Sequence, residues 1–316
     1  MRCRKRRRSA PLCRRLLKSC ALQTALAVAL LPAAQTDDFE QALAKYKNRH
    51  YQEALPLAEQ ALRQDRNNPS YLHLYGVTLA ALGQFSLAED NLRKAVTLDP
   101  GQPTFSYELG SLLHQERKYV EAVPVLKRAV ELDPENLTAR MMLARSYVFS
   151  YHELQITNLV ELTLEQLNYI VKKDPKFPGV HHHIALVYIN SGEPGKAVEE
   201  LSTELRYYPA NAQARLELGE TLLKLNQYHK AVEELVVAAR QAPQMASIPF
   251  ALAKAYKAEG QTQRALEAAR KCVELDPQFA AGHYLLGQLY RDTGQPELAR
   301  QQFELFRQLK DPSASP

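Results

Sequence analysis

The sequence has no tryptophan, and only 4 cysteines and 12 glycines among its 316 residues. Three of the cysteines lie close to the N-terminus, at Cys3, Cys13 and Cys20, which leaves Cys272 alone in the rest of the chain. A disulfide within that part is therefore excluded, and its fold must be held by packing. Cys272 occupies a slot that the repeat described below reserves for small buried residues, so we expect an inert core thiol.

The sequence also lacks the short motifs of the common catalytic sites. It contains no glycine-rich phosphate loop, no Gly-x-Ser-x-Gly, no His-Glu-x-x-His and no paired cysteine motif. We therefore expect no enzymatic activity and no cofactor, with a site hidden in a loop at 150–157 as a remote alternative. The run His181-His182-His183 suggests a metal site, but consecutive helical residues point about 100° apart and cannot converge on one ion. We expect helix-surface histidines and no metal.

The net charge of +5 has a local origin. Residues 1–34 hold nine basic residues and no acid, so the remainder has 31 basic against 35 acidic residues, a net charge of −4. A body of that charge has no general attraction for phosphate backbones, and we expect no nucleic-acid partner.

Residues 1–34 have the composition of a targeting segment. A basic stretch precedes an apolar run from Ala21 to Leu31, and the small residues Ala33 and Ala34 offer a cleavage site. The apolar run is shorter than the ~20 residues that a membrane-spanning helix needs. We expect a cleaved signal and a periplasmic or secreted protein. An uncleaved membrane anchor, a mitochondrial transit peptide and a twin-arginine signal at Arg14-Arg15 remain alternatives.

The rest of the chain repeats itself with a period of 34 residues. Alanine recurs at this spacing at Ala88 and Ala122, and again at Ala197, Ala231, Ala265 and Ala299, each four residues before another core residue. Two helices of about 12–14 residues and two tight turns fill such a period. Proline ends six of the units, after Asp99, Asp133, Asp174, Tyr208, Ala242 and Asp276. In several units a glycine, at 83, 192, 260 or 294, marks the turn between the two helices.

A second recurring pattern is a Leu-Gly or similar pair in the first helix of each unit, with Leu or Tyr three residues after the second member of the pair in most units. The pairs are Tyr75-Gly76, Leu109-Gly110, Leu143-Ala144, Ile184-Ala185, Leu218-Gly219, Leu252-Ala253 and Leu286-Gly287. In this pattern the sequence resembles the tetratricopeptide repeat family over nearly the whole of 37–311. It departs from the family pattern by lacking the early tryptophan, and by about seven extra residues at 150–157, expected to form a longer loop or an extended helix pair.

The resemblance implies an all-α fold, a right-handed solenoid of about eight helix-turn-helix repeats at 35–311, followed by a tail at 312–316. The repeats are expected at 37–68, 69–102, 103–136, 137–177, 178–211, 212–245, 246–279 and 280–311. A hairpin of this kind cannot bury both its faces alone, so stability is shared between neighbouring repeats.

The resemblance also implies a concave groove lined by the first helices. Residues at i and i+4 share a helix face, so two stripes of groove residues are expected side by side. The candidate binding residues are His73, Tyr107, Met141, Arg145, His182, Leu216, Glu220, Phe250, Lys254, Tyr284 and Gln288. Relatives that bind acidic chaperone C-termini use Lys and Asn at fixed groove positions, and Val77, Ser111 and Leu186 stand there instead, so that ligand is not expected. Side chains that merely fill a narrow groove are the alternative.

We therefore expect an adaptor or scaffold that binds another polypeptide in this groove. The main alternative is a structural solenoid that associates with itself through its terminal helix, 297–309, or its convex face. The acidic pairs Glu199-Glu200 and Glu233-Glu234 fall at the start of second helices, where we expect them to favour the helix dipole and face solvent. The partner's identity cannot be read from the sequence.

Overall fold

The computed structural model describes residues 38–150 and 158–311, and all of its regular secondary structure in these ranges is helical. The targeting segment at 1–34, the insertion at 151–157 and the tail at 312–316 lie outside the described residues. Among the described residues, no helix has both the length and the apolar character that crossing a bilayer demands.

The chain divides into two compact units, the first ending at Leu98 and the second beginning at Asp99. The first unit contains α1 (Asp38–Lys47), α2 (Tyr51–Gln64), α3 (Pro69–Ala81) and α4 (Phe85–Leu98). These pair in sequence order as two hairpins, and α2 packs on α3. Alanines and leucines such as Ala54, Ala88 and Leu92 are fully buried between them.

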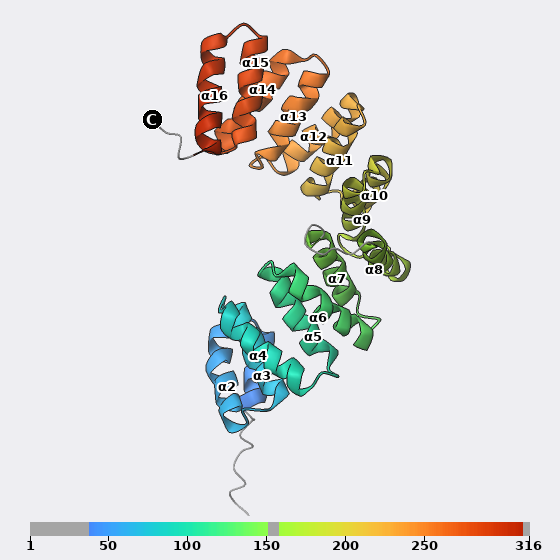
Figure 1. Ribbon diagram of the computed structural model, residues 1–316, viewed down its shortest axis with the longest axis vertical. Helices are drawn as coiled ribbons and strands as arrows, with labels where there is room; N and C mark the ends of the chain where they lie inside the picture. The colour runs from blue at the N-terminus through green and yellow to red at the C-terminus, as the bar shows by residue number, and fades with distance from the viewer. Residues whose placement is uncertain (1–37, 151–157, 312–316) are drawn as a thin grey trace, which may run out of the picture. The chain divides into compact units, whose positions relative to one another are not determined.

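The second unit continues the same plan as six further hairpins in chain order (Figure 1). Its helices are α5 (Pro103–Gln115), α6 (Tyr119–Leu132), α7 (Leu137–Phe149), α8 (Leu159–Lys173), α9 (Val180–Asn190), α10 (Pro194–Tyr207), α11 (Ala212–Lys224), α12 (Tyr228–Gln241), α13 (Ser247–Ala258), α14 (Thr262–Leu275), α15 (Ala280–Asp292) and α16 (Pro296–Lys310). The prediction of an all-α repeat solenoid is therefore confirmed.

The turns inside the hairpins follow the sequence signals. Gly83, Gly192, Gly260 and Gly294 all have positive φ, between 73° and 79°. In three further hairpins a non-glycine residue takes the same left-handed conformation, at Arg49, Arg117 and Asn226. The turn geometry is thus set by the repeat, and glycine is used where it is available because it has no Cβ to clash.

The small residue in each first helix allows the two helices of a hairpin to approach closely. A Cβ added at Gly110 would lie 2.5 Å from Cγ of Leu126, and one at Gly219 would lie equally close to Cγ of Leu235. Both leucines are fully buried. The Leu-Gly pair is therefore a packing requirement of the hairpin, and it places each first helix at a fixed depth against its second helix.

Candidate polypeptide-binding face

The odd-numbered helices of the second unit form its inner layer. Besides packing on its own second helix, α7 contacts both α5 and α9, and α11 contacts α13. No contact of comparable extent joins successive even-numbered helices among the described residues. The layer whose helices approach one another more closely is the concave one, so the inner face is formed by α5, α7, α9, α11, α13 and α15.

Two of the predicted groove residues, His182 and Gln288, contact a side chain on a neighbouring inner helix. The Nε2 atom of His182 on α9 lies 2.7 Å from Oε2 of Glu217 on α11. Lys257 on α13 contacts α15 twice, with its Nζ atom 3.3 Å from Oε1 of Gln288 and 3.2 Å from Oδ2 of Asp292. Polar pairs therefore join neighbouring repeats on the inner face, between α9 and α11 and between α13 and α15.

The predicted binding residues differ in how far their side chains are exposed. Tyr284 and Lys254 are exposed, with Tyr284 at 44%. Most of the others are half-buried, namely His73 in the first unit and Tyr107, Arg145, His182, Glu220, Phe250 and Gln288 in the second. Burial lowers the pKa of His73 to about 4, so this ring is neutral at physiological pH.

Two predicted residues belong to the hydrophobic core. Met141 is 7% exposed and packs in a cluster with Val180 and Ile184, between α7 and α9. Leu216 is 4% exposed and packs with Ile248, between α11 and α13. Both aliphatic side chains fill the space between two successive inner helices. The row of predicted binding residues is therefore not exposed at Met141 and Leu216.

Two aromatic residues among the predicted binding residues, Phe250 and Tyr284, pack against other aromatic rings. Phe250 packs partly against the core of the last repeats and meets the Phe279 ring edge to face, with centroids 5.1 Å apart. The Tyr284 ring contacts Phe303 and Phe306 of α16. Lys254 lies with its Nζ atom 5.5 Å from the centroid of the Phe250 ring. This end of the inner face thus presents rigid aromatic rings beside a cation, a combination common at protein interfaces.

Charge on the inner face is partly shielded from solvent. Burial raises the pKa of Glu220, and the positive charges of Lys254 and Lys224 act in the opposite direction. Burial lowers the pKa of His182, but the hydrogen bond and charge of Glu217, with the charge of Glu204, raise it above its ordinary value overall. Burial also raises the pKa of Glu108 on α5. The inner face is therefore a setting in which an added charged group interacts strongly.

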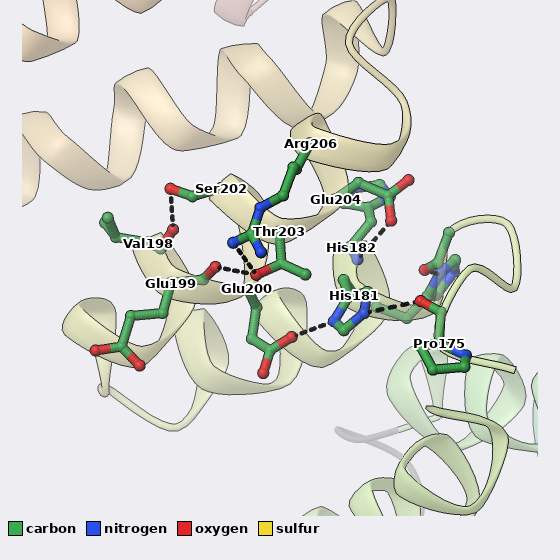
Figure 2. A network of polar contacts seen from close by, with 12 residues as sticks. Pro175, His181, His182, Val198, Glu199, Glu200, Ser202, Thr203, Glu204 and Arg206 are labelled. Atoms are coloured by element: carbon green, nitrogen blue, oxygen red, sulfur yellow. Dashed lines mark hydrogen bonds and ion pairs between the residues drawn. The ribbon is translucent and has the colours of Figure 1, made fainter. Parts of the chain in front are cut away.

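The prediction of three histidines on the helix surface is wrong for His181, which is buried. His182 and His183 are each half-buried and hydrogen-bonded. The Nδ1 and Nε2 atoms of His181 lie 2.6 Å from Oε2 of Glu200 and 3.1 Å from the Pro175 carbonyl (Figure 2). His183 donates from Nδ1 to the Gly179 carbonyl. The three rings therefore point to different partners, as their helical positions require.

The prediction that the acidic pairs face solvent is correct for Glu199 and Glu233, which are exposed, and wrong for their neighbours. Glu200 binds His181 as described, and Oε2 of Glu234 lies 2.5 Å from Nη1 of Arg215. In each pair the second glutamate faces the first helix of its own hairpin. Consecutive residues of a helix point about 100° apart, so the first glutamate of each pair faces solvent and the second faces the other helix of the hairpin.

These two contacts belong to a recurring arrangement that the sequence interpretation missed. In four repeats, an Arg or His near the start of the first helix binds a carbonyl six residues earlier and a polar side chain on the second helix. The sets are Arg140 with Pro134 and Gln166, His181 with Pro175 and Glu200, Arg215 with Pro209 and Glu234, and His283 with Pro277 and Gln302. We call this the turn latch. The signal was present in the sequence, because Pro and the basic residue keep a spacing of six in every case.

An aromatic cluster at the end of α7 was also missed. Phe149 is 49% exposed and stacks on Tyr119 of α6. The two ring centroids are 5.1 Å apart and the angle between the ring planes is 21°. The ring of His114 on α5 meets the Phe149 ring with centroids 5.8 Å apart. Phe149 stands just before the insertion in the sequence, where the repeat pattern is interrupted and pattern matching gives no position to compare.

Cys272 is fully buried, as expected for a core residue. Burial, with the nearby charge of Asp276, raises the pKa of its thiol to about 12. The thiolate that reacts with oxidants and metals is therefore scarce at physiological pH. No group of three or more metal-binding side chains occurs in residues 38–150 and 158–311.

Comparison with known proteins agrees with this architecture. A family model described as tetratricopeptide repeat matches residues 39–103, 76–137, 184–246 and 250–314. Members of this family mediate protein–protein interaction and scaffolding. A solved tetratricopeptide repeat protein from Parabacteroides merdae superposes with a TM-score of 0.61, covering 78% of this chain and 94% of that one at 17% identity. That likeness is one of fold.

Two curated relatives match parts of the chain. The anaphase-promoting complex subunit CDC16 of Saccharomyces cerevisiae is 25% identical over 155 residues, which is 48% of this chain and 18% of that protein. The N-terminal acetyltransferase A complex auxiliary subunit NAA15 of Arabidopsis thaliana is 27% identical over 109 residues, 34% of this chain and 12% of that one. The chain thus spans less than a fifth of the length of either relative.

Proposed function

Because this chain belongs to the tetratricopeptide repeat family, we propose that it is an adaptor or assembly scaffold that binds a polypeptide segment along the inner face of its second unit. The observation that carries the proposal is the row of partly exposed aromatic and charged side chains on successive inner helices, from Tyr107 to Tyr284. Aromatic rings supply apolar area for a bound segment, and charges beside them fix its register. The relatives named above are subunits of protein complexes by their names, which agrees with such a role.

The test is affinity capture with the chain from Gln35 onward, comparing the wild type with a Lys254→Glu/Tyr284→Ser variant. Both side chains are exposed, so the variant is expected to keep its fold and lose its partner. Lys230→Glu is the control for the charge reversal, because Lys230 is exposed on α12, away from the inner layer. Equal capture by all three proteins would contradict binding on the inner face.

We further propose that the scaffold acts outside the cytoplasm, in a periplasmic or other envelope assembly, after removal of the leader. The support is the basic and then apolar order of residues 1–34 and the small residues at Ala33 and Ala34. N-terminal sequencing of the protein purified from its own cells tests this. A mature N-terminus near Gln35 agrees with export, whereas an intact Met1 in a membrane fraction indicates an anchor.

A second candidate function is self-association through α16. Its residues Leu298 and Leu305 are 36% and 41% exposed and lie two turns apart on one face of the helix. We propose a second copy of this chain as the occupant of that face. Sedimentation velocity of the wild type and a Leu298→Glu/Leu305→Glu variant tests it, because a monomer at high concentration for both proteins contradicts self-association.

A further inference from the structure

A glutamate occupies a core position in the fifth repeat, 178–211. Seven residues after the recurring alanine, or after Thr163 in the fourth repeat, the other repeats have an apolar residue, namely Ala61, Ala95, Ala129, Ile170, Ala238, Cys272 and Phe306. The fifth repeat has Glu204 there, on α10, and this residue is only 1% exposed. A buried carboxylate destabilises a fold unless it is paired, so a departure from the repeat pattern at such a position indicates a function.

The Glu204 carboxylate has two hydrogen bonds and no cation as a partner. Its Oε2 atom accepts from the backbone N–H of His182 at 3.4 Å (Figure 2), and its Oε1 atom accepts from Nδ2 of Asn211 at 3.2 Å. Among residues 38–150 and 158–311, no basic side chain lies at ion-pair distance from it, and the His182 ring pairs with Glu217 instead. Because a carboxylate accepts about four hydrogen bonds, Glu204 has room for further donors.

Glu204 is the most deeply buried residue that lines a cavity of about 590 Å³. The other lining residues are 178–179, between α8 and α9, and 207–211, between α10 and α11. All of these are half-buried or exposed, so the cavity is open to solvent. It therefore lies at the turns between repeats rather than on the inner helices, and its volume is in the range of about 300–1,000 Å³ that ligand sites have.

Two tyrosine side chains, held by neighbouring elements, line the same cavity. The Tyr207 ring stacks on His181, with centroids 5.9 Å apart, and the Tyr208 hydroxyl donates to the Lys176 carbonyl. Five other repeats have an aspartate at the Tyr208 position, namely Asp65, Asp99, Asp133, Asp174 and Asp276. Aromatic faces attract cations, and the Nζ atom of Lys176 already lies 5.8 Å from the centroid of the Tyr207 ring.

From this geometry we infer that the cavity binds an organic cation whose N–H groups donate to the Glu204 carboxylate while its carbon chain packs on Tyr207 and Tyr208. We call this the Glu204 site. The ligand class is an alkylammonium or alkylguanidinium group, either in a small molecule or in a lysine or arginine side chain. Such a group supplies the positive charge that Glu204 lacks, through charge-assisted hydrogen bonds beside aromatic rings. The inference does not rest on the proposed function, because the site is separate from the inner face.

The experiment follows the methyl signal of Ala210, which lines the cavity, in a carbon-13 NMR spectrum of the chain from Gln35 onward. We expect a saturable shift with n-butylammonium and with n-butylguanidinium. Tetramethylammonium, a cation without an N–H group, should bind about tenfold more weakly, since it makes no charge-assisted hydrogen bond. Nα-acetyl-lysine methylamide distinguishes the two sources of the ligand. If it binds as tightly as n-butylammonium, the site admits a polypeptide side chain, and if only the free amines bind, the ligand is a small molecule.

The variant Glu204→Gln keeps the size of the side chain and removes its charge, so it should bind n-butylammonium about tenfold more weakly. Glu204→Ala introduces the residue that four other repeats have at this position, and it should also lose binding while keeping its helix content. Glu199→Gln is the matched control, because it makes the same change at an exposed position of α10 and should bind as the wild type does. Circular dichroism melting curves check that the variants fold, and the comparison with tetramethylammonium needs no variant.

Two results would overturn the inference. The Glu204 site is wrong if the Ala210 signal of the wild type shifts with neither alkyl probe, or if Glu204→Gln binds the probes as tightly as the wild type. Glu204 would then serve only to accept the His182 N–H at the start of α9. Either result leaves the proposed function standing, because the capture experiment with Lys254→Glu/Tyr284→Ser tests the inner face separately.

Discussion

The Nε2 atom of His182 lies 2.7 Å from Oε2 of Glu217, and this pair joins the inner helices of two successive repeats. The Glu217 carboxylate also accepts a hydrogen bond from Nε2 of Gln213, through its other oxygen. Both partners of the ion pair are half-buried, so solvent screens it less than a surface pair. The contact links α9 to α11 through side chains on the face that we propose for ligand binding.

This pair predicts a stability difference that depends on pH. The pKa of His182 is raised above its ordinary 6.5, so the contribution is complete below that value and is lost as the pH rises through the folded pKa. A double-mutant cycle of His182→Gln and Glu217→Gln, measured by urea unfolding, should give a coupling energy of about 1–2 kcal/mol near pH 6 and a smaller one near pH 8.5. Equal coupling at both pH values would show that the pair does not depend on charge.

The two neutral histidines, His114 and His183, predict that acid destabilises the fold, whereas acid strengthens the His182–Glu217 pair. His114 and His183 have pKa values lowered to about 4, so between the ordinary 6.5 and that value the unfolded chain binds more protons. Stability should therefore fall on acidification, by at most about 1.4 kcal/mol per pH unit for each histidine. His114→Gln should flatten this dependence above pH 5. Parallel curves for wild type and His114→Gln would contradict the assignment.

The turn latch predicts that Arg215 contributes more to stability than an exposed arginine. Arg215 binds the Pro209 carbonyl and Glu234, so Arg215→Met removes two hydrogen bonds from one turn and should cost about 1–3 kcal/mol. Arg307→Met on α16 is the control, because Arg307 pairs with Glu304 at an exposed site, where about 0.5 kcal/mol is expected. Similar losses for the two variants in chemical unfolding would mean that the latch is not a stabilising element.

The close approach of α5 and α6 predicts that Gly110→Ala destabilises the second unit. The added Cβ would lie 2.5 Å from Cγ of Leu126, so the buried Leu126 side chain or α6 must shift, at a cost of about 1–3 kcal/mol. Gly195→Ala is the control, since an added Cβ there has no neighbour within 4 Å. Thermal unfolding distinguishes the two, because the control should be neutral or slightly stabilised by the higher helix propensity of alanine. A neutral Gly110→Ala would show that the hairpin is not tightly packed.

The period, the turns and the small residues of the hairpins could be predicted because they are local properties. Proline ends a helix through its own ring and missing N–H, and a left-handed turn favours glycine whatever surrounds it. The 34-residue spacing then repeats these constraints along the chain, so the helices α3 to α16 follow the expected order with a second helix after each first one. The sequence by itself therefore determined the architecture and the general position of the inner face.

The tertiary structure alone decided which residues of that face are available. Met141 and Leu216 occupy the same repeat position as Tyr284, yet they are buried because the neighbouring inner helix covers an aliphatic side chain there. The same holds for charge: Glu200 faces His181 and Glu199 faces solvent, although the sequence pattern treats them alike. Whether a charge finds a partner, as Glu217 does in His182, depends on the side chains that adjacent repeats bring within a few ångströms. Periodicity fixes the direction of a side chain, but only the packed neighbours fix its surroundings.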